Sequence, residues 1–238
     1  MQILLLSDIH GNFPALLAIA EHFKKKNFDL ICNCGDSIVY APFPNETLHW
    51  LEENNVSSIL GNTDRKIKKL LSGKQFKKPG KLEKRIMYTW TAEQLDKGSK
   101  DYLLSLKKQR MIQTKHQRIN LFHGSPEHPN EFLFPDTPAS RFVELSNGYE
   151  NSIIITGHSH TPYYRQIGDT HFINPGSVGR MFDSDPSASC AVLTLNKNKV
   201  SVKHYRILYP VEQTIATLAK HKLPDIYQTM YMLGQKLN

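Results

Sequence analysis

The sequence of 238 residues has few cysteines and no long apolar run. Its three cysteines, an odd number, argue against a disulfide framework and indicate a reducing compartment, so we expect a cytoplasmic protein. The first apolar stretch, from Ile3 to Leu6, is too short for a signal peptide, and we expect none. No stretch approaches the roughly 20 apolar residues that span a bilayer, so we expect no membrane partner.

Acidic residues are scarce in one segment above all. The chain has 30 Lys and Arg against 22 Asp and Glu, a net charge of +8. Between Arg65 and Arg118 there are 17 Lys and Arg against 4 Asp and Glu, so the rest of the chain is net acidic. Such a segment can attract nucleic acid or other polyanions, but it can also be a solvated lysine-rich surface. No nucleic-acid-binding motif accompanies it, which favours the solvated surface.

Strand patterns that alternate with helix patterns predict an α/β fold of one domain over residues 1–238. The first third indicates strands at 2–7, 28–33 and 56–60, and helices at 13–26 and 45–54. The second half indicates strands at 110–115, 118–122 and 152–156, hairpins at 163–174 and 188–207, a helix at 139–146 and a helical tail from 211. The basic segment, about 65–110, is expected to be an insertion or lid, with a loop at 70–81 and a helix at 93–106.

Five short polar clusters follow these predicted strands. They are Asp8-Ile9-His10, Gly35-Asp36, Gly61-Asn62-Thr63-Asp64, His123-Gly124 and Gly157-His158-Ser159-His160. Ligands of open α/β sheets bind beyond the carboxyl ends of the strands, so the clusters can converge on one rim, where their glycines permit close backbone approach. Each residue alone has a structural alternative: Asp8 can cap a helix, His10 can be a loop histidine and Asn62 can hold a turn.

Together the clusters offer imidazole, carboxylate and amide ligands. Seven such groups are too many for one tetrahedral ion, and they suit two ions that share a carboxylate. This ligand mixture favours Mn²⁺, with Fe, Zn²⁺ or Ni²⁺ as alternatives, over Ca²⁺ or Mg²⁺. The sequence therefore predicts two divalent transition-metal ions.

The same clusters, with Asn174-Pro175-Gly176-Ser177-Val178-Gly179, resemble the motif series of the calcineurin-like metallophosphoesterases. The likeness is to the small prokaryotic phosphodiesterase branch, related to diadenosine tetraphosphatase. It implies a four-layer α/β/β/α sandwich of two mixed sheets, and a metal-bridging hydroxide that attacks phosphorus in line. It also implies that Asp36 bridges two ions, one bound by Asp8, His10 and His160 and the other by Asn62, His123 and His158.

Thr63 departs from the family pattern, because many members have a histidine there that assists the leaving group. Threonine is no acid near neutral pH, so we expect a phosphodiesterase or nucleotide pyrophosphatase. A phosphomonoesterase, a phosphoprotein phosphatase, a non-catalytic scaffold and a nuclease that uses the basic segment are the alternatives. The expected catalytic residues are Asp36, Asn62, Thr63 and Asp64, and Arg180 and Arg65 are candidates for binding substrate phosphate. The sequence leaves the oligomeric state open.

Overall fold

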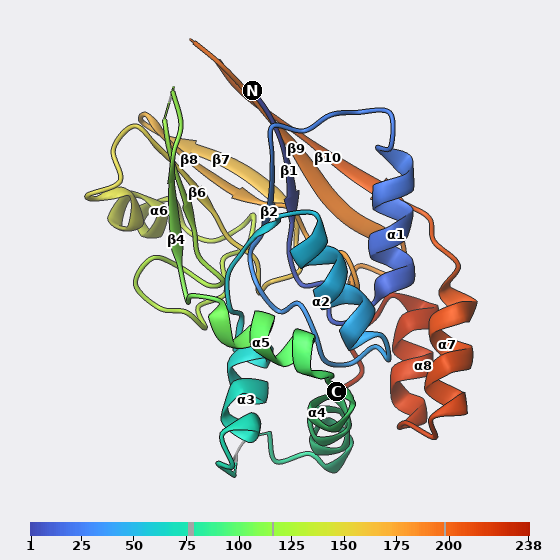
Figure 1. The fold of residues 1–238 in the computed structure, drawn as a ribbon. Helices are drawn as coiled ribbons and strands as arrows, with labels where there is room; N and C mark the ends of the chain where they lie inside the picture. The colour runs from blue at the N-terminus through green and yellow to red at the C-terminus, as the bar shows by residue number, and fades with distance from the viewer. Residues whose placement is uncertain (76–78, 116, 198) are drawn as a thin grey trace.

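The computed structural model describes residues 1–75, 79–115, 117–197 and 199–238. Within these residues the chain forms ten strands and eight helices, and the strands make two five-stranded sheets that face each other (Figure 1). Both sheets are mixed, and helices flank them. The expected α/β fold class is confirmed.

The first sheet has the strand order β10-β9-β1-β2-β3. Its strands are β1 (Gln2–Leu6), β2 (Leu30–Asn33), β3 (Ser57–Ser58), β9 (Ala188–Asn196) and β10 (Lys199–Ile207). Strands β1, β2 and β3 run parallel to one another, and β9 runs antiparallel to both of its neighbours, β1 and β10. Two crossover helices, α1 (Phe13–His22) and α2 (Pro44–Glu53), connect the parallel strands, as the alternating pattern predicted. The third strand is shorter than expected, because only two residues pair with β2.

The second sheet has the strand order β4-β5-β6-β8-β7. Its strands are β4 (Arg110–Gln113), β5 (Arg118–Leu121), β6 (Ser152–Ile155), β7 (Tyr163–Ile167) and β8 (Thr170–Asn174). Three of them, β5, β6 and β8, run parallel, with an antiparallel strand at each edge. Helix α6 (Ala139–Ser146) lies where the sequence predicted it.

Alternation along β1 explains how the layers pack. Ile3 and Leu5 point into a core shared with the second sheet, whereas Leu4 and Leu6 point into the core under the flanking helices. A third core packs Phe142 of α6 against the outer face of the second sheet. Each fully buried large apolar side chain stabilises the fold by about 1.5–3 kcal/mol. The core between the sheets therefore holds their strand ends together at one rim.

The basic segment differs from its prediction. It forms three helices, α3 (Asn62–Leu71), α4 (Leu82–Gln94) and α5 (Lys97–Ser105). Helix α3 packs against α4 and α5, and both of these pack against α2. Two predictions were therefore wrong in detail. The expected loop at 70–81 begins only after Leu71, and the expected helix at 93–106 is two helices that break at Leu95–Asp96. The run of lysines hid the apolar face of α3, where Ile67 is buried. Residues 76–78 of the expected loop lie outside the described residues.

The helical tail forms α7 (Val211–Lys220) and α8 (Asp225–Leu233), which pack together beside α1 (Figure 1). The side-chain oxygen of Asn12 caps α1 and also accepts a hydrogen bond from Thr214 of α7. None of the helices in the described part of the chain is both long enough and apolar enough to cross a lipid bilayer.

Candidate metal centre

The loops that follow five parallel strands meet at one rim of the two sheets. Asp8 and His10 follow β1, Asp36 follows β2, and Asn62 follows β3 at the start of α3. His123 follows β5, and His158 and His160 follow β6, so the second sheet supplies the remaining histidines. The seven residues expected to bind metal thus come from both sheets.

The side chains form two groups, each able to surround one cation. The ligand atoms of Asp8, His10 and His160 lie within 4.8 Å of one another, and so do those of Asp36, His123 and His158. Oδ1 of Asn62 lies 3.0 Å from Nε2 of His123 and so belongs to the second group. These are the two sets that the sequence resemblance implied.

Asp36 lies between the two groups. Its Oδ1 is 3.5 Å from Nε2 of His123, and its Oδ2 is 4.0 Å from Nε2 of His10. One carboxylate oxygen therefore faces each group, which is the arrangement that a bridging ligand requires.

Polar atoms of both groups are left without compensation. Among the described residues, the buried Oδ1 of Asp8 has no hydrogen-bond partner. Nε2 of His10 lies 3.2 Å from Nε2 of His160, and Nδ1 of His158 lies 3.1 Å from Nε2 of His123. Buried polar groups that are not compensated cost free energy, and a cation between these atoms would remove that cost. The residues present therefore fit a pair of metal ions.

The second nitrogens of two histidines are fixed by backbone oxygens. Nδ1 of His123 lies 2.8 Å from the carbonyl oxygen of Cys34, and Nδ1 of His160 lies 2.5 Å from that of Arg180. An N–H on Nδ1 donates in each case, so Nε2 is the ring nitrogen that faces the site. This contact sets the tautomer that a metal-binding histidine needs.

The electrostatics of the site also suit a cation. Burial lowers the pKa of His10 to about 3, and burial with the positive charge of His123 lowers the pKa of His158 to about 4. Both imidazoles are therefore neutral near pH 7, the form that binds metal. Burial would also lower the pKa of His123, but the carboxylate of Asp36 raises it to about 9. His123 in turn outweighs burial and holds the pKa of Asp36 well below its usual range.

Backbone strain is concentrated at the same residues. Five of the seven have positive φ angles between 52° and 65°: Asp8, His10, Asp36, His158 and His160. This left-handed conformation costs a non-glycine residue about 1 kcal/mol or more, and it persists where the surrounding fold imposes it. The sequence gives no sign of this strain.

The four glycines of the clusters, Gly35, Gly61, Gly124 and Gly157, are required by close packing, as expected. A Cβ atom at Gly61 would lie 2.0 Å from Oδ1 of Asp36, and one at Gly157 would lie 2.0 Å from Oγ of Ser7. A side chain at either position would displace the loops that carry the site.

Comparison with known proteins identifies the family. The calcineurin-like phosphoesterase superfamily domain matches residues 1–198. The chain belongs to this superfamily. This phosphoesterase is therefore a hydrolase of a metal-dependent family, and the resemblance seen in its motifs is confirmed.

Similar proteins come from archaea and bacteria. An uncharacterised protein of Methanocaldococcus jannaschii is 28% identical over 98% of both chains. The phosphodiesterase YfcE of Escherichia coli K12 is 24% identical over 79% of this chain and 85% of its own. The crystal structure of a metallophosphoesterase from Sphaerobacter thermophilus matches with a TM-score of 0.77 and 26% identity, and covers 98% of this chain and 99% of the other. A hypothetical protein of Pyrococcus horikoshii shares the fold, with a TM-score of 0.86, 21% identity and 99% coverage of both chains.

The segment 174–180 braces the candidate metal centre of this phosphoesterase. Asn174 donates to the carbonyl oxygen of Gly157, and Ser177 donates to that of Asp8. The backbone amide of Gly179 also donates to the carbonyl oxygen of Asp8. The family resemblance included residues 174–179 as a motif but implied no role for them. The structure shows that they tie the first cluster to the fifth.

Thr63 and Asp64 make contacts with the backbone of the neighbouring loops. The Thr63 hydroxyl donates to the carbonyl oxygen of Ile38, and its amide donates to Asp36. The buried carboxylate of Asp64 accepts hydrogen bonds from the amides of Ser37, Ile38 and Gly61. Both residues therefore hold the second cluster against the third.

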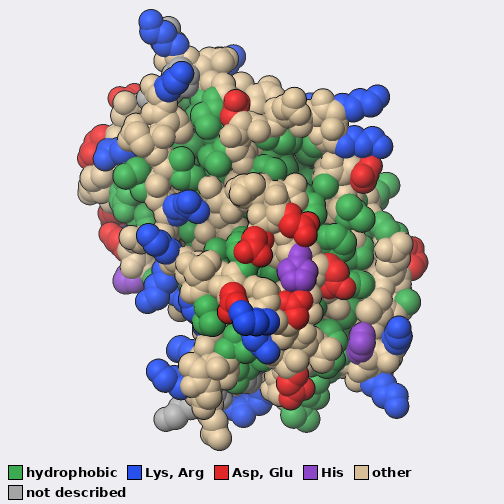
Figure 2. Space-filling view, in the orientation of Figure 1, with side chains coloured by type: hydrophobic (Ala, Val, Ile, Leu, Met, Phe, Trp, Pro, Cys, Tyr) green, Lys and Arg blue, Asp and Glu red, His purple; other side chains and the backbone are tan. Residues whose placement is uncertain are grey.

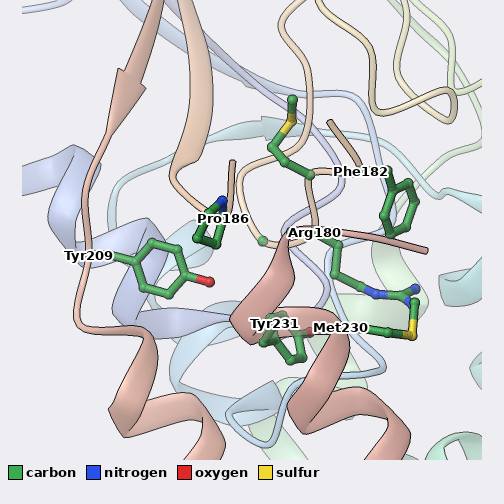
Figure 3. A pocket seen from close by; sticks show the side chains of 9 residues that line it. Arg180, Phe182, Pro186, Tyr209, Met230 and Tyr231 are labelled. Carbon is green, nitrogen blue, oxygen red and sulfur yellow. The ribbon is translucent and has the colours of Figure 1, made fainter. Parts of the chain in front are cut away.

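Arg180 is a buried cation beside the candidate metal centre. Its side chain is 8% exposed, and its guanidinium carbon lies 4.1 Å from the ring centre of Tyr40. Figure 3 shows the guanidinium between Phe182 and the sulfur of Met230, to which Nη2 donates at 3.6 Å. Its Nε has no hydrogen-bond partner among the described residues. Arg180 lines a cavity of about 470 Å³ that metal-ligand candidates also line, among them His10, Asp36, Asn62, His158 and His160.

The other phosphate-binding candidate, Arg65, lies in a neighbouring groove, where its Nη2 donates to Oδ1 of Asn130 at 2.7 Å. Phe132, which the sequence analysis did not select, lies between this groove and the cavity and lines both. Its ring stacks on that of His158, with the centres 4.1 Å apart. Its loop carries no motif, so only the tertiary structure identifies it.

Proposed function

We propose that this phosphoesterase binds two metal ions and hydrolyses phosphodiester or nucleotide pyrophosphate bonds. The observation that carries the proposal is the pair of ligand groups with Asp36 between them. Manganese is the metal we favour, with iron, zinc or nickel as alternatives. When bound, two such ions neutralise charge on the phosphoryl group and make water a nucleophile at neutral pH.

The chain's own residues would hold and orient this site. We assign Asp8, His10 and His160 to one ion, and Asn62, His123 and His158 to the other. Asp36 would be shared, and Asp64 is a positioning residue, because its carboxylate is occupied by backbone amides. Since both sheets contribute ligands, the distance between the two ions would depend on the packing of the whole sandwich.

The leaving group separates the candidate substrates. The hydroxyl of Thr63 donates its hydrogen bond to the carbonyl oxygen of Ile38, so we expect this side chain to supply no proton to the departing oxygen. A general acid typically accelerates a reaction by about 10²–10⁴-fold, and most where the leaving group is poor. Phosphodiesters and pyrophosphates with good leaving groups are therefore favoured over alkyl phosphomonoesters and phosphoproteins. The similarity to a phosphodiesterase supports the same choice.

Arg180 is the residue we propose to bind a phosphoryl oxygen of the substrate. It is a buried guanidinium that makes none of the ion pairs found within the described residues. An unpaired buried charge is costly, and an anionic substrate would compensate it.

The experiment compares Asp36→Asn with wild type on bis-p-nitrophenyl phosphate. We expect chelation of metal from the wild type, or the substitution itself, to reduce hydrolysis by at least about 10³-fold, because the shared ligand is lost. Metal analysis should find two ions per wild-type chain and fewer in the variant. Asp169→Asn, at an exposed turn, is the matched control and should retain activity. Undiminished hydrolysis by the chelated enzyme or by Asp36→Asn would contradict the proposal.

A further inference from the structure

A basic groove opens directly beside the candidate metal centre. It has a volume of about 1360 Å³, larger than the roughly 300–1,000 Å³ of typical small-molecule sites. Asn62 and His158, assigned above to the second ion, line its inner end. Asn62, Lys66, Phe132 and His158 line both this groove and the cavity of Arg180, so the two spaces adjoin each other.

The charge of the groove has one sign. Its described lining contains no aspartate or glutamate, but it contains six cationic side chains: Arg65, Lys66, Lys68, Lys69, Lys107 and Lys108. Four of them project from α3, and two come from the segment between α5 and β4. In Figure 2, blue side chains gather at the lower left, the region that α3 and the end of α5 occupy in Figure 1. Like charges crowded in this way are compensated when phosphates bind.

Two aromatic rings stand where the groove meets the metal centre. Phe132 is 49% exposed although it stacks on His158. Phe134 lies parallel to Phe132, with ring centres 6.0 Å apart, and is also exposed. Exposed aromatic rings beside a cationic groove are the combination by which proteins bind single strands, because bases stack on the rings while phosphates follow the cations.

We infer that the groove binds a single-stranded oligonucleotide, and that this is the substrate of the proposed phosphodiesterase. One phosphodiester would lie at the metal centre, a neighbouring base would stack on Phe132, and the following phosphates would run along α3. Hydrolysis would add water across one P–O bond, leaving one fragment with a terminal phosphate and the other with a hydroxyl. The departing sugar oxygen would take its proton from water, because Thr63 supplies none, so the strand should be cut more slowly than bis-p-nitrophenyl phosphate, whose leaving group needs no proton. The cleavage step rests on the proposed function, whereas the binding step does not.

Two features of the groove favour an extended strand over a compact nucleotide as its ligand. Its volume exceeds that of a site for one small molecule, and its cations lie on two separate segments. A strand with a phosphate at every nucleotide can reach both segments, so affinity should rise with strand length until the groove is filled.

Fluorescence anisotropy of 5′-labelled dT12, measured in EDTA over a range of KCl concentrations, tests the binding step. Lys69→Ala/Lys107→Ala/Lys108→Ala should weaken binding by at least about tenfold at low salt. It should also make the slope of log K against log[salt] shallower by about 2, since each phosphate contact on a single strand contributes about 0.7. The matched control is Lys25→Ala/Lys199→Ala/Lys220→Ala, which removes the same charge from exposed positions outside the groove. We expect the control to bind within about twofold of wild type.

Three results would overturn the inference. They are an unchanged affinity in the groove variant, equal affinities for dT2 and dT12, and displacement of labelled dT12 by a dinucleoside tetraphosphate at lower concentration than by unlabelled dT12.

The cleavage step is tested separately, with Mn²⁺ added. The wild type should then cut dT12, and binding without cleavage would refute the substrate assignment if bis-p-nitrophenyl phosphate is hydrolysed. Because the binding assay contains no metal, failure of the proposed function alone would leave dT12 binding intact.

Discussion

At the scale of single residues, the candidate site contains several side chains and backbone conformations that destabilise the fold. Arg180 is buried and has no carboxylate partner in the part of the chain that the structure describes, and the face of Tyr40 stabilises its charge only in part. Asp8 and His10 have positive φ angles and carry unpartnered buried atoms. Such positions destabilise the fold and are retained where a site needs them.

We therefore expect Arg180→Met to lower activity without lowering stability. A lost charge-assisted contact to phosphate should reduce kcat/KM for bis-p-nitrophenyl phosphate by roughly 10- to 100-fold, mainly through KM. Methionine fits the aromatic surroundings without a desolvation penalty, so the melting temperature should stay the same or rise. Steady-state kinetics and thermal melts measure the two effects.

Arg118→Met, at an exposed arginine, is the control for this substitution and should change neither quantity. A large fall in the melting temperature of Arg180→Met, with kcat/KM unchanged, would show that Arg180 is a structural residue.

At the scale of elements, helix α6, which packs on the second sheet, supports the loop that carries Phe132. Arg141 of α6 contacts three carboxylates, those of Glu127, Glu131 and Glu144. Glu131 also accepts a hydrogen bond from the hydroxyl of Ser125. These contacts fix the segment between Ser125 and Phe132, so α6 sets the position of the aromatic ring beside the metal centre.

Arg141→Gln should destabilise the protein in a pH-dependent way. The hydrogen bond from Arg141 lowers the pKa of Glu131 below its usual 4.5 in the folded state. The stabilisation is therefore present above pH 4.5, and it is lost as pH falls through the lower, folded-state pKa. The groups are partly exposed, so we expect a cost of about 1 kcal/mol at pH 7 and a smaller one near pH 3. Urea unfolding of variant and wild type at both pH values measures this, and an equal cost at both would refute it.

At the scale of the whole molecule, the candidate metal centre joins the two sheets. Asp8 and Asp36 belong to the first sheet, whereas His123, His158 and His160 belong to the second. Elsewhere the sheets are joined through the apolar core between them, and Nε2 of His204 in β10 lies 2.8 Å from the carbonyl oxygen of Asn174 in β8. Bound metal would therefore add a further polar link, at the rim, to an interface that is mainly apolar.

Metal should accordingly stabilise the whole fold. A ligand at 100 times its dissociation constant stabilises the folded state by about 2.7 kcal/mol, which is roughly 5–10 °C in melting temperature for a chain of this size. Differential scanning fluorimetry with EDTA and then with Mn²⁺ should show this increase in wild type. Asp36→Asn should show a much smaller one. An equal shift in both proteins would mean that the stabilising ion binds elsewhere.

The sequence by itself determined the order of strands and helices and the polar clusters that end the strands. Both are local features: a continuous run of apolar residues predicts β1, the cap at Asn12 predicts the start of α1, and the glycine-rich clusters predict turns. It was less successful at α3 to α5, because the lysines there conceal the few apolar positions that pack.

Only the tertiary structure decided which residues face one another across the sheets. It buried Arg180 against Tyr40 and brought Phe132 onto His158, whereas the family resemblance had already implied the place of Asp36 between the two histidine groups. These contacts join residues far apart in the chain, and they depend on how the two sheets pack through the core between them. No local pattern carries that information, because the packing is a property of the whole fold.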